Sequence, residues 1–155
     1  MNNKTKSDSD LIKELDLPGR EKFKLLCEKL GVEFGEPSNE KLAYDCYIIR
    51  NGKKYLVELK DRNPKLEERD EYFLEVYKYD CLRAWKKRLN AAGIYYFCWF
   101  GNTVYIFNLE DDYVTKNPQR ICMNKETYKS RDVKIQKDVY LLDKTKAKKI
   151  TLKSK

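Results

Sequence analysis

Two acidic residues and a lysine lie where a predicted hairpin would bring them together. Asn51-Gly52 favours a two-residue type I′ turn, because both central residues of that turn need positive φ. With this turn Asp45 lies opposite Glu58, with Cβ atoms about 5 Å apart. Lys60 returns to the same face because side chains alternate along a strand. The sequence therefore predicts two carboxylates and one ammonium group on a single, largely apolar face.

Two opposed carboxylates on an apolar face need a cation, because like charges across a ladder repel and burial raises the cost. Oxygen ligands of this kind suit Mg²⁺. A metal site between Asp45 and Glu58 is one interpretation, and a structural ion cluster neutralised by Lys60 is the other. Both interpretations remain open at this point.

Composition restricts the chemistry and the location that can be expected. The chain has 155 residues, a mean hydropathy of −0.81 and no apolar run long enough to span a bilayer. Its polar N-terminus predicts neither a signal nor a transit peptide, so we expect a cytoplasmic protein with no membrane partner. The absence of histidine excludes catalytic triads and HNH-type sites, and five scattered cysteines predict reduced thiols rather than a zinc site.

Positive charge is concentrated in the C-terminal part of the sequence. Residues 113–155 contain 13 Lys and Arg against 4 Asp and Glu, whereas residues 1–112 are almost neutral. A basic segment attached to a neutral core indicates a polyanionic partner such as DNA, and a solvated tail is the alternative. The expected phosphate-binding residues are Lys129, Arg131, Lys134 and Lys137.

Hydrophobic periodicity predicts the elements around the hairpin. We expect a helix over 20–30, a short strand over 32–34, a long helix over 70–90 and a buried strand over 94–100. Further strands are predicted over 103–109 and 139–142.

This order of elements, together with Asp45 and the Glu58-Leu59-Lys60 motif, resembles the PD-(D/E)XK nuclease superfamily. The resemblance implies an α/β fold with a restriction-endonuclease-like core: a central mixed sheet with helices on both faces, in the order α-β-β-β-α-β. It would divide the chain into a flexible segment over 1–17, a nuclease-like core over 18–112 and a basic extension over 113–155, packed on the same domain.

The spacing is also similar to that of the archaeal-type Holliday junction resolvases. That branch has an acidic residue near the start of its first helix, which is Glu21 here, with Glu28 as a rival. Lys78, four residues before Leu82, matches a supporting position on the following helix. Tyr44 stands where the superfamily name has proline, and residues 113–155 have no counterpart in the resemblance.

The resemblance implies a DNA endonuclease that depends on Mg²⁺ or Mn²⁺ and acts on branched or structured DNA. Asp45, Glu58 and the Leu59 carbonyl would hold the metal, and Lys60 would orient or deprotonate the attacking water. The alternative is a non-catalytic nucleic-acid-binding module on the same fold. Cleavage of a four-way junction would require a homodimer, for which the sequence shows no interface.

Overall fold

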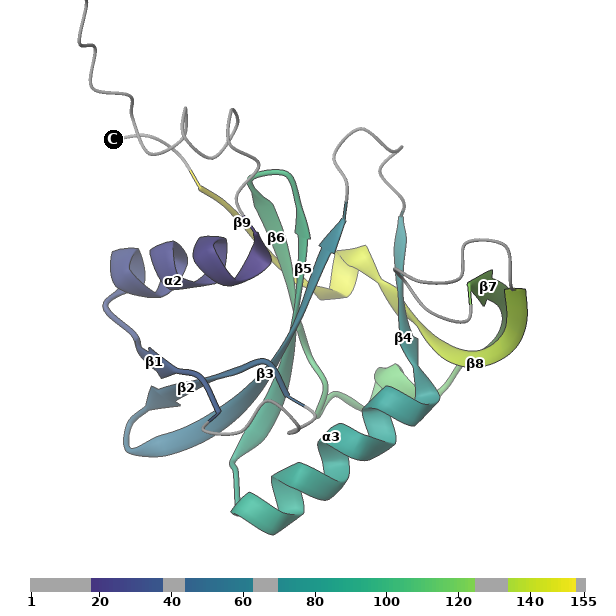
Figure 1. The fold of residues 1–155 in the computed structure, drawn as a ribbon, viewed down its shortest axis with the longest axis horizontal. Helices are drawn as coiled ribbons and strands as arrows, with labels where there is room; N and C mark the ends of the chain where they lie inside the picture. Colours follow the sequence, from purple (N-terminus) through teal and green to yellow (C-terminus); the bar gives the residue numbers. More distant parts are fainter. Residues whose placement is uncertain (1–17, 38–43, 63–69, 125–133, 153–155) are drawn as a thin grey trace, which may run out of the picture.

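The protein is described by a computed structural model over residues 18–37, 44–62, 70–124 and 134–152. Within these residues, a six-stranded sheet has the order β1-β2-β3-β5-β6-β9, and a three-stranded sheet has the order β4-β8-β7 (Figure 1). The elements in chain order are α2 (Gly19–Leu30), β1 (Glu33–Gly35), β2 (Cys46–Arg50), β3 (Lys53–Arg62), β4 (Glu71–Glu75), α3 (Val76–Leu89), β5 (Gly93–Phe100), β6 (Thr103–Asn108), β7 (Pro118–Asn124), β8 (Lys134–Asp143) and β9 (Lys148–Thr151). Two 3-10 turns, Asp112–Thr115 and Lys144–Lys146, precede β7 and β9.

The central hairpin forms as predicted from its turn. Asn51 and Gly52 have φ values of 52° and 74°, and Arg50 faces Lys53 across the turn. The same register pairs Cys46 with Val57 at the far end of β2. β3 continues beyond this pairing and runs parallel to β5, so it lies in the interior of the mixed sheet.

Helix α2 covers one face of this sheet. Phe23, Leu26 and Cys27 form its buried stripe, and Gly31 ends the helix in the left-handed region with φ 66°. These side chains pack with Val57, Phe97 and other apolar residues of the sheet. The apolar residues that predicted this helix are therefore mostly the ones that pack it against the sheet.

Helix α3 and the three-stranded sheet cover the opposite face, as Figure 1 shows. Leu82 of α3 and Leu74 of β4 are almost fully buried there, together with Leu56 and Phe107 of the main sheet. The predicted α/β class, with a central mixed sheet and helices on both faces, is confirmed.

The predicted helix over 70–90 is wrong in its first turn, because Glu71–Glu75 forms strand β4. Tyr72 and Leu74 alternate with more exposed residues, and β4 pairs antiparallel with β8. Pairing with a strand about seventy residues away in the sequence overrides the helical pattern. Tyr77, in the first turn of α3, is 77% exposed.

The basic C-terminal part contributes strands to both sheets. The predicted strand over 139–142 lies within β8, which pairs with β4 and β7, and β9 pairs with β6 at the edge of the main sheet. All five cysteines are free thiols, as expected. In the described part of the chain, neither helix is long and apolar enough to cross a membrane.

Candidate functional site

The hairpin places Asp45, which directly precedes β2, next to Glu58 of β3. The Asp45 N–H donates to the Val57 carbonyl at 3.0 Å, and Asp45 Oδ2 accepts from the Leu59 N–H at 2.9 Å. The Asp45 carboxylate is thus fixed against the strand that carries the other acid. Its side chain is 29% exposed, so it remains accessible from solvent.

Glu58 is the more buried acid, with a side chain that is 13% exposed. Burial, followed by repulsion from Asp45, raises the pKa of Glu58 to about 8, although the nearby Lys78 ammonium opposes this shift. Glu58 Oε2 is buried and has no hydrogen-bond partner among the described residues. A buried carboxyl oxygen without a partner is costly, so this position is poised to accept a proton or a cation.

Lys78 reaches Glu58 from α3. Its Nζ lies 3.3 Å from Glu58 Oε1, so the predicted supporting residue does join the site. The first turn of α3 directly follows β4, and this strand-to-helix junction positions Lys78.

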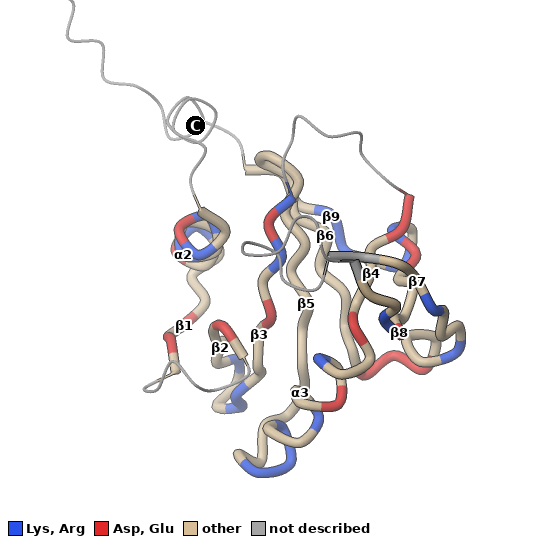
Figure 2. Tube along the Cα trace, turned by 45° about the vertical axis from the view of Figure 1, so that its right-hand side comes forward, with Lys and Arg blue, Asp and Glu red and all other residues tan. Residues whose placement is uncertain are grey.

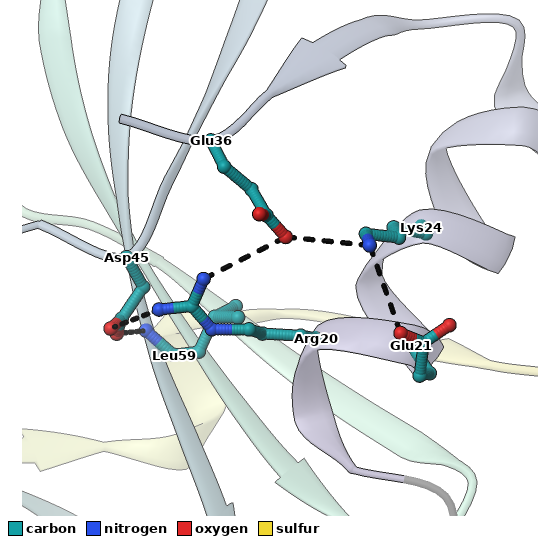
Figure 3. A network of polar contacts seen from close by, with 6 residues as sticks. All are labelled: Arg20, Glu21, Lys24, Glu36, Asp45 and Leu59. Atoms are coloured by element: carbon teal, nitrogen blue, oxygen red, sulfur yellow. Dashed lines mark hydrogen bonds and ion pairs between the residues drawn. The ribbon is translucent and has the colours of Figure 1, made fainter. Parts of the chain in front are cut away.

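Arg20 approaches Asp45 from the opposite side, in the first turn of α2 (Figure 3). Its Nη2 lies 3.5 Å from Asp45 Oδ1, and its Nη1 lies 3.7 Å from Glu36 Oε1. Sequence reasoning missed Arg20. Its position in the sequence could have indicated it, because Arg20 directly precedes Glu21, the residue singled out at the start of this helix.

The structure does not bring Glu21 or Glu28 to the two hairpin acids. Glu21 forms an ion pair with Lys24, which also contacts Glu36. In Figure 3 the dashed contacts connect Glu21 to Asp45 indirectly, through Lys24, Glu36 and Arg20. Glu28 is exposed in the second half of α2. Among the described residues, no three His, Cys, Asp or Glu side chains form a group suited to a metal ion.

A buried lysine anchors the start of α2 beside the hairpin. Lys22 is 2% exposed, and its Nζ donates to Asp61 Oδ1 at 2.8 Å and to the Gly101 carbonyl at 3.0 Å. It also lies over the Trp99 ring at 5.3 Å. Asp61 directly follows the predicted catalytic Lys60, so this contact fixes the helix that carries Arg20 relative to β3.

Lys60 is partly buried on β3, opposite Cys98 of β5. It lies two residues after Glu58, and strand alternation therefore directs both side chains to the α3 face. The structure thus places Asp45, Glu58 and Lys60 on neighbouring positions of one hairpin, as the sequence predicts.

The donor set can be compared with the needs of a divalent cation. Asp45 and Glu58 supply carboxylate oxygens, and one of these oxygens is buried without a partner. Hard cations such as Mg²⁺ prefer oxygen ligands and commonly bind through one or two carboxylates. The chemistry of these two acids is therefore suited to a Mg²⁺ or Mn²⁺ ion.

The predicted DNA-binding residues are less fully described. Lys137 lies on β8, where its Nζ donates to Glu75 Oε1 at 2.6 Å, and Lys134 begins the same strand. Lys129 and Arg131 lie outside the described residues. Figure 2 shows Lys and Arg residues on α3, β8 and β9.

Comparison with known proteins finds a similarity in structure but none in sequence. No protein family model and no curated protein matches the sequence. The chain is similar to a solved structure of Hjc, a Holliday junction resolvase from the archaeal hyperthermophile Archaeoglobus fulgidus, with 13% sequence identity. The match covers 79% of this chain and 88% of that chain, with a TM-score of 0.48.

Proposed function

We propose that the protein is a metal-dependent endonuclease that hydrolyses DNA phosphodiester bonds, with Mg²⁺ or Mn²⁺ held by Asp45 and Glu58. The observation that carries the proposal is the buried Glu58 carboxyl, which faces a second acid and has one oxygen without a partner. The Glu58-Leu59-Lys60 motif, which resembles that of PD-(D/E)XK nucleases, supports it.

The two nearby cations leave the acids incompletely neutralised. Lys78 and Arg20 lie 3.3 and 3.5 Å from the nearest carboxylate oxygens, longer than the roughly 2.7–2.9 Å of a strong charge-assisted hydrogen bond. Neither contact satisfies Glu58 Oε2. A divalent ion would stabilise the ionised form of both acids, which monovalent partners at these distances do only in part.

The roles of the residues follow from this arrangement. Asp45, Glu58 and the Leu59 carbonyl would hold the ion, which when bound supplies Lewis-acid activation of water and neutralises charge on the phosphate. Lys60 would orient or deprotonate the attacking water and offset charge in the transition state. Arg20 and Lys78, once released from the carboxylates, would contact the scissile phosphate.

The basic C-terminal part would hold the DNA backbone. Lys134 and Lys137 of β8, with Lys129 and Arg131 in the preceding segment, are the proposed phosphate contacts. Contacts of this kind position a duplex without reading its sequence. We propose that the protein encounters this DNA in the cytoplasm.

A branched substrate is the finer proposal, based on the spacing of Glu21, Asp45 and Glu58. In this proposal Glu21 supports cleavage, and a homodimer provides two active sites for one four-way junction. Glu21→Gln should then lower turnover, whereas Glu28→Gln should behave as a surface change. An inactive Glu28→Gln protein beside an active Glu21→Gln protein would reverse this assignment and leave the Asp45–Glu58 centre unaffected.

A non-catalytic nucleic-acid-binding module is the second candidate. It is favoured by the Arg20 and Lys78 contacts, which give each acid a cationic neighbour without any metal. Such a module would bind DNA equally well with and without a divalent ion and would cleave none of the substrates below.

The deciding experiment is a cleavage assay on linear, nicked, single-stranded and four-way-junction DNA, with Mg²⁺, Mn²⁺ or EDTA. We expect metal-dependent cleavage that Asp45→Asn and Glu58→Gln each abolish. Glu33→Gln, which changes an exposed acid on β1, is the matched control and should cleave like the wild type. Cleavage that survives in Asp45→Asn or Glu58→Gln contradicts the assignment of the site.

A further inference from the structure

An apolar groove of about 470 Å³ lies on the α2 face of the main sheet, away from the two hairpin acids. The apolar side chains that line it come from α2, β2, β5, β6 and β9, among other positions, and include Leu26, Leu30, Phe97, Ile106 and Ile150. Leu30 is 57% exposed at its edge. An apolar surface of this kind usually marks a binding site for another segment or molecule.

The groove exists because α2 covers only part of its face. Phe23, Leu26 and Cys27 of α2 are buried against the sheet, whereas Ile106 of β6 and Ile150 of β9 remain partly exposed beside the helix. On the other face, α3 and the three-stranded sheet share the covering. The α2 face has room for one more short element.

The rim of the groove is positively charged. Arg50, Lys146 and Lys148 line it, against the single acid Asp111. An occupant that fits this site therefore combines apolar side chains with an excess of acidic ones.

Residues 1–17, which directly precede α2, contain such a stretch. Its apolar residues are Leu11, Ile12, Leu15 and Leu17, and its charged residues between positions 8 and 16 are Asp8, Asp10, Lys13, Glu14 and Asp16. The other stretches outside the described residues carry at most one large aliphatic side chain each, at Leu42, Leu66 and Val133. Only the N-terminal stretch matches the groove in both apolarity and charge.

The point of attachment also permits this contact. The stretch is followed by Pro18, the N-cap residue of the helix that lines the groove. Helix α2 has 12 residues and is about 18 Å long, at 1.5 Å per residue. Seven residues of extended chain span up to about 23 Å, so residues 11–17 can run back alongside the helix to Leu26 and Leu30.

We propose that residues 11–17 bind in this groove within the same chain. Leu11, Ile12 and Leu15 pack on the apolar floor, and the two acidic residues of the segment, Glu14 and Asp16, pair with Lys146 and Lys148 on the rim. The contact completes the core on the α2 face. It is separate from the proposed function, because the groove contains neither Asp45 nor Glu58.

The test uses the full-length protein and a hydrophobic dye, 8-anilinonaphthalene-1-sulfonate. Ile12→Asp with Leu15→Asp should release the stretch, increase dye fluorescence several-fold and lower the melting temperature. Asn2→Asp with Asn3→Asp adds the same charge outside the apolar stretch and should leave both readouts unchanged. Equal dye binding by the two variants overturns the proposal.

Charge reversal provides an independent readout. Lys148→Glu should also increase dye fluorescence, and adding Glu14→Lys to that variant should restore the wild-type signal. Light scattering identifies a competing occupant. If the wild type is a dimer that Ile150→Asp splits into monomers, while the Ile12 and Leu15 changes leave it intact, a second copy fills the groove and the proposal is overturned.

Discussion

The two faces of the central sheet differ in which side chains they bury and which they leave exposed. On the α3 face, an ionisable residue, Glu58, is largely buried beneath a helix and a second sheet. On the α2 face, apolar side chains such as Leu30 and Ile150 remain in contact with solvent. Strand β3 supplies both faces through simple alternation. A cation that binds the buried acid would be stabilised on the α3 face, whereas an apolar segment that covers the exposed side chains would be stabilised on the α2 face.

The largest difference between the faces should appear when one leucine is truncated on each. Leu82 of α3 is fully buried, so Leu82→Ala should lower the free energy of unfolding by about 2–5 kcal/mol. Leu30→Ala should cost less than half as much, because the described residues leave this side chain 57% exposed and only the short segment 11–17 is proposed to cover it. Denaturant unfolding of both variants measures this contrast, and equal losses would show that the α2 face is as closely covered as the α3 face.

The next largest effect is a pH dependence that originates on the α3 face. Folded Glu58 keeps its proton up to a pKa of about 8, whereas in the unfolded chain it ionises near 4.5. The folded state therefore binds more protons between these values, and metal-free stability should fall as pH rises, by up to about 1.4 kcal/mol per pH unit. Glu58→Gln should flatten this slope in unfolding measurements with EDTA between pH 5.5 and 8.5. Identical slopes for both proteins would contradict the burial of a protonated Glu58.

A smaller effect separates the two cations of the site. Lys78→Met removes the ammonium group that lowers the pKa of folded Glu58, so the upper end of the pH range over which stability falls should move upward, while its lower end near 4.5 stays in place. Arg20→Met breaks a longer and more exposed contact, and should change stability by less than about 1 kcal/mol. The comparison is made on metal-free protein across the same pH range. A larger shift from Arg20→Met would mean that the α2 side controls the titration of Glu58.

The smallest expected effect concerns DNA affinity. A lysine that contacts phosphate contributes about one unit to the slope of log affinity against log salt concentration. Lys137 is already bonded to Glu75 at 2.6 Å, so Lys137→Gln should reduce the slope by less than this amount. Titrations with labelled duplex at several salt concentrations measure the change. A full unit of loss would show that Lys137 leaves Glu75 when DNA binds.

Local signals determined which features the sequence could predict. The Asn51-Gly52 turn set the hairpin register, and with it the juxtaposition of Asp45 and Glu58. The apolar run after Gly93 likewise predicted β5. These features depend on residues close together in the chain, where turn chemistry and periodicity are informative.

Features that depend on distant residues were missed. Residues 71–75 form strand β4 because they pair with β8. The amino acids of 71–75 alone do not indicate that a distant strand will pair with them. Arg20 reaches Asp45 because α2 is packed on the sheet and the contact between Lys22 and Asp61 holds its first turns against β3. The groove on the α2 face results from the width of the whole sheet relative to one helix. Tertiary packing decided each of these outcomes.

Calorimetry of Mn²⁺ binding to the metal-free protein tests the central claim most directly, because it reports on the acids without requiring DNA. At pH 7, titration in two buffers of different ionisation enthalpy should reveal binding accompanied by release of close to one proton, since Glu58 must ionise to hold the metal. Proton release should disappear above pH 9, and Asp45→Asn or Glu58→Gln should abolish binding. Binding that persists in both variants, or the absence of binding to the wild type, would contradict a metal centre at these two acids.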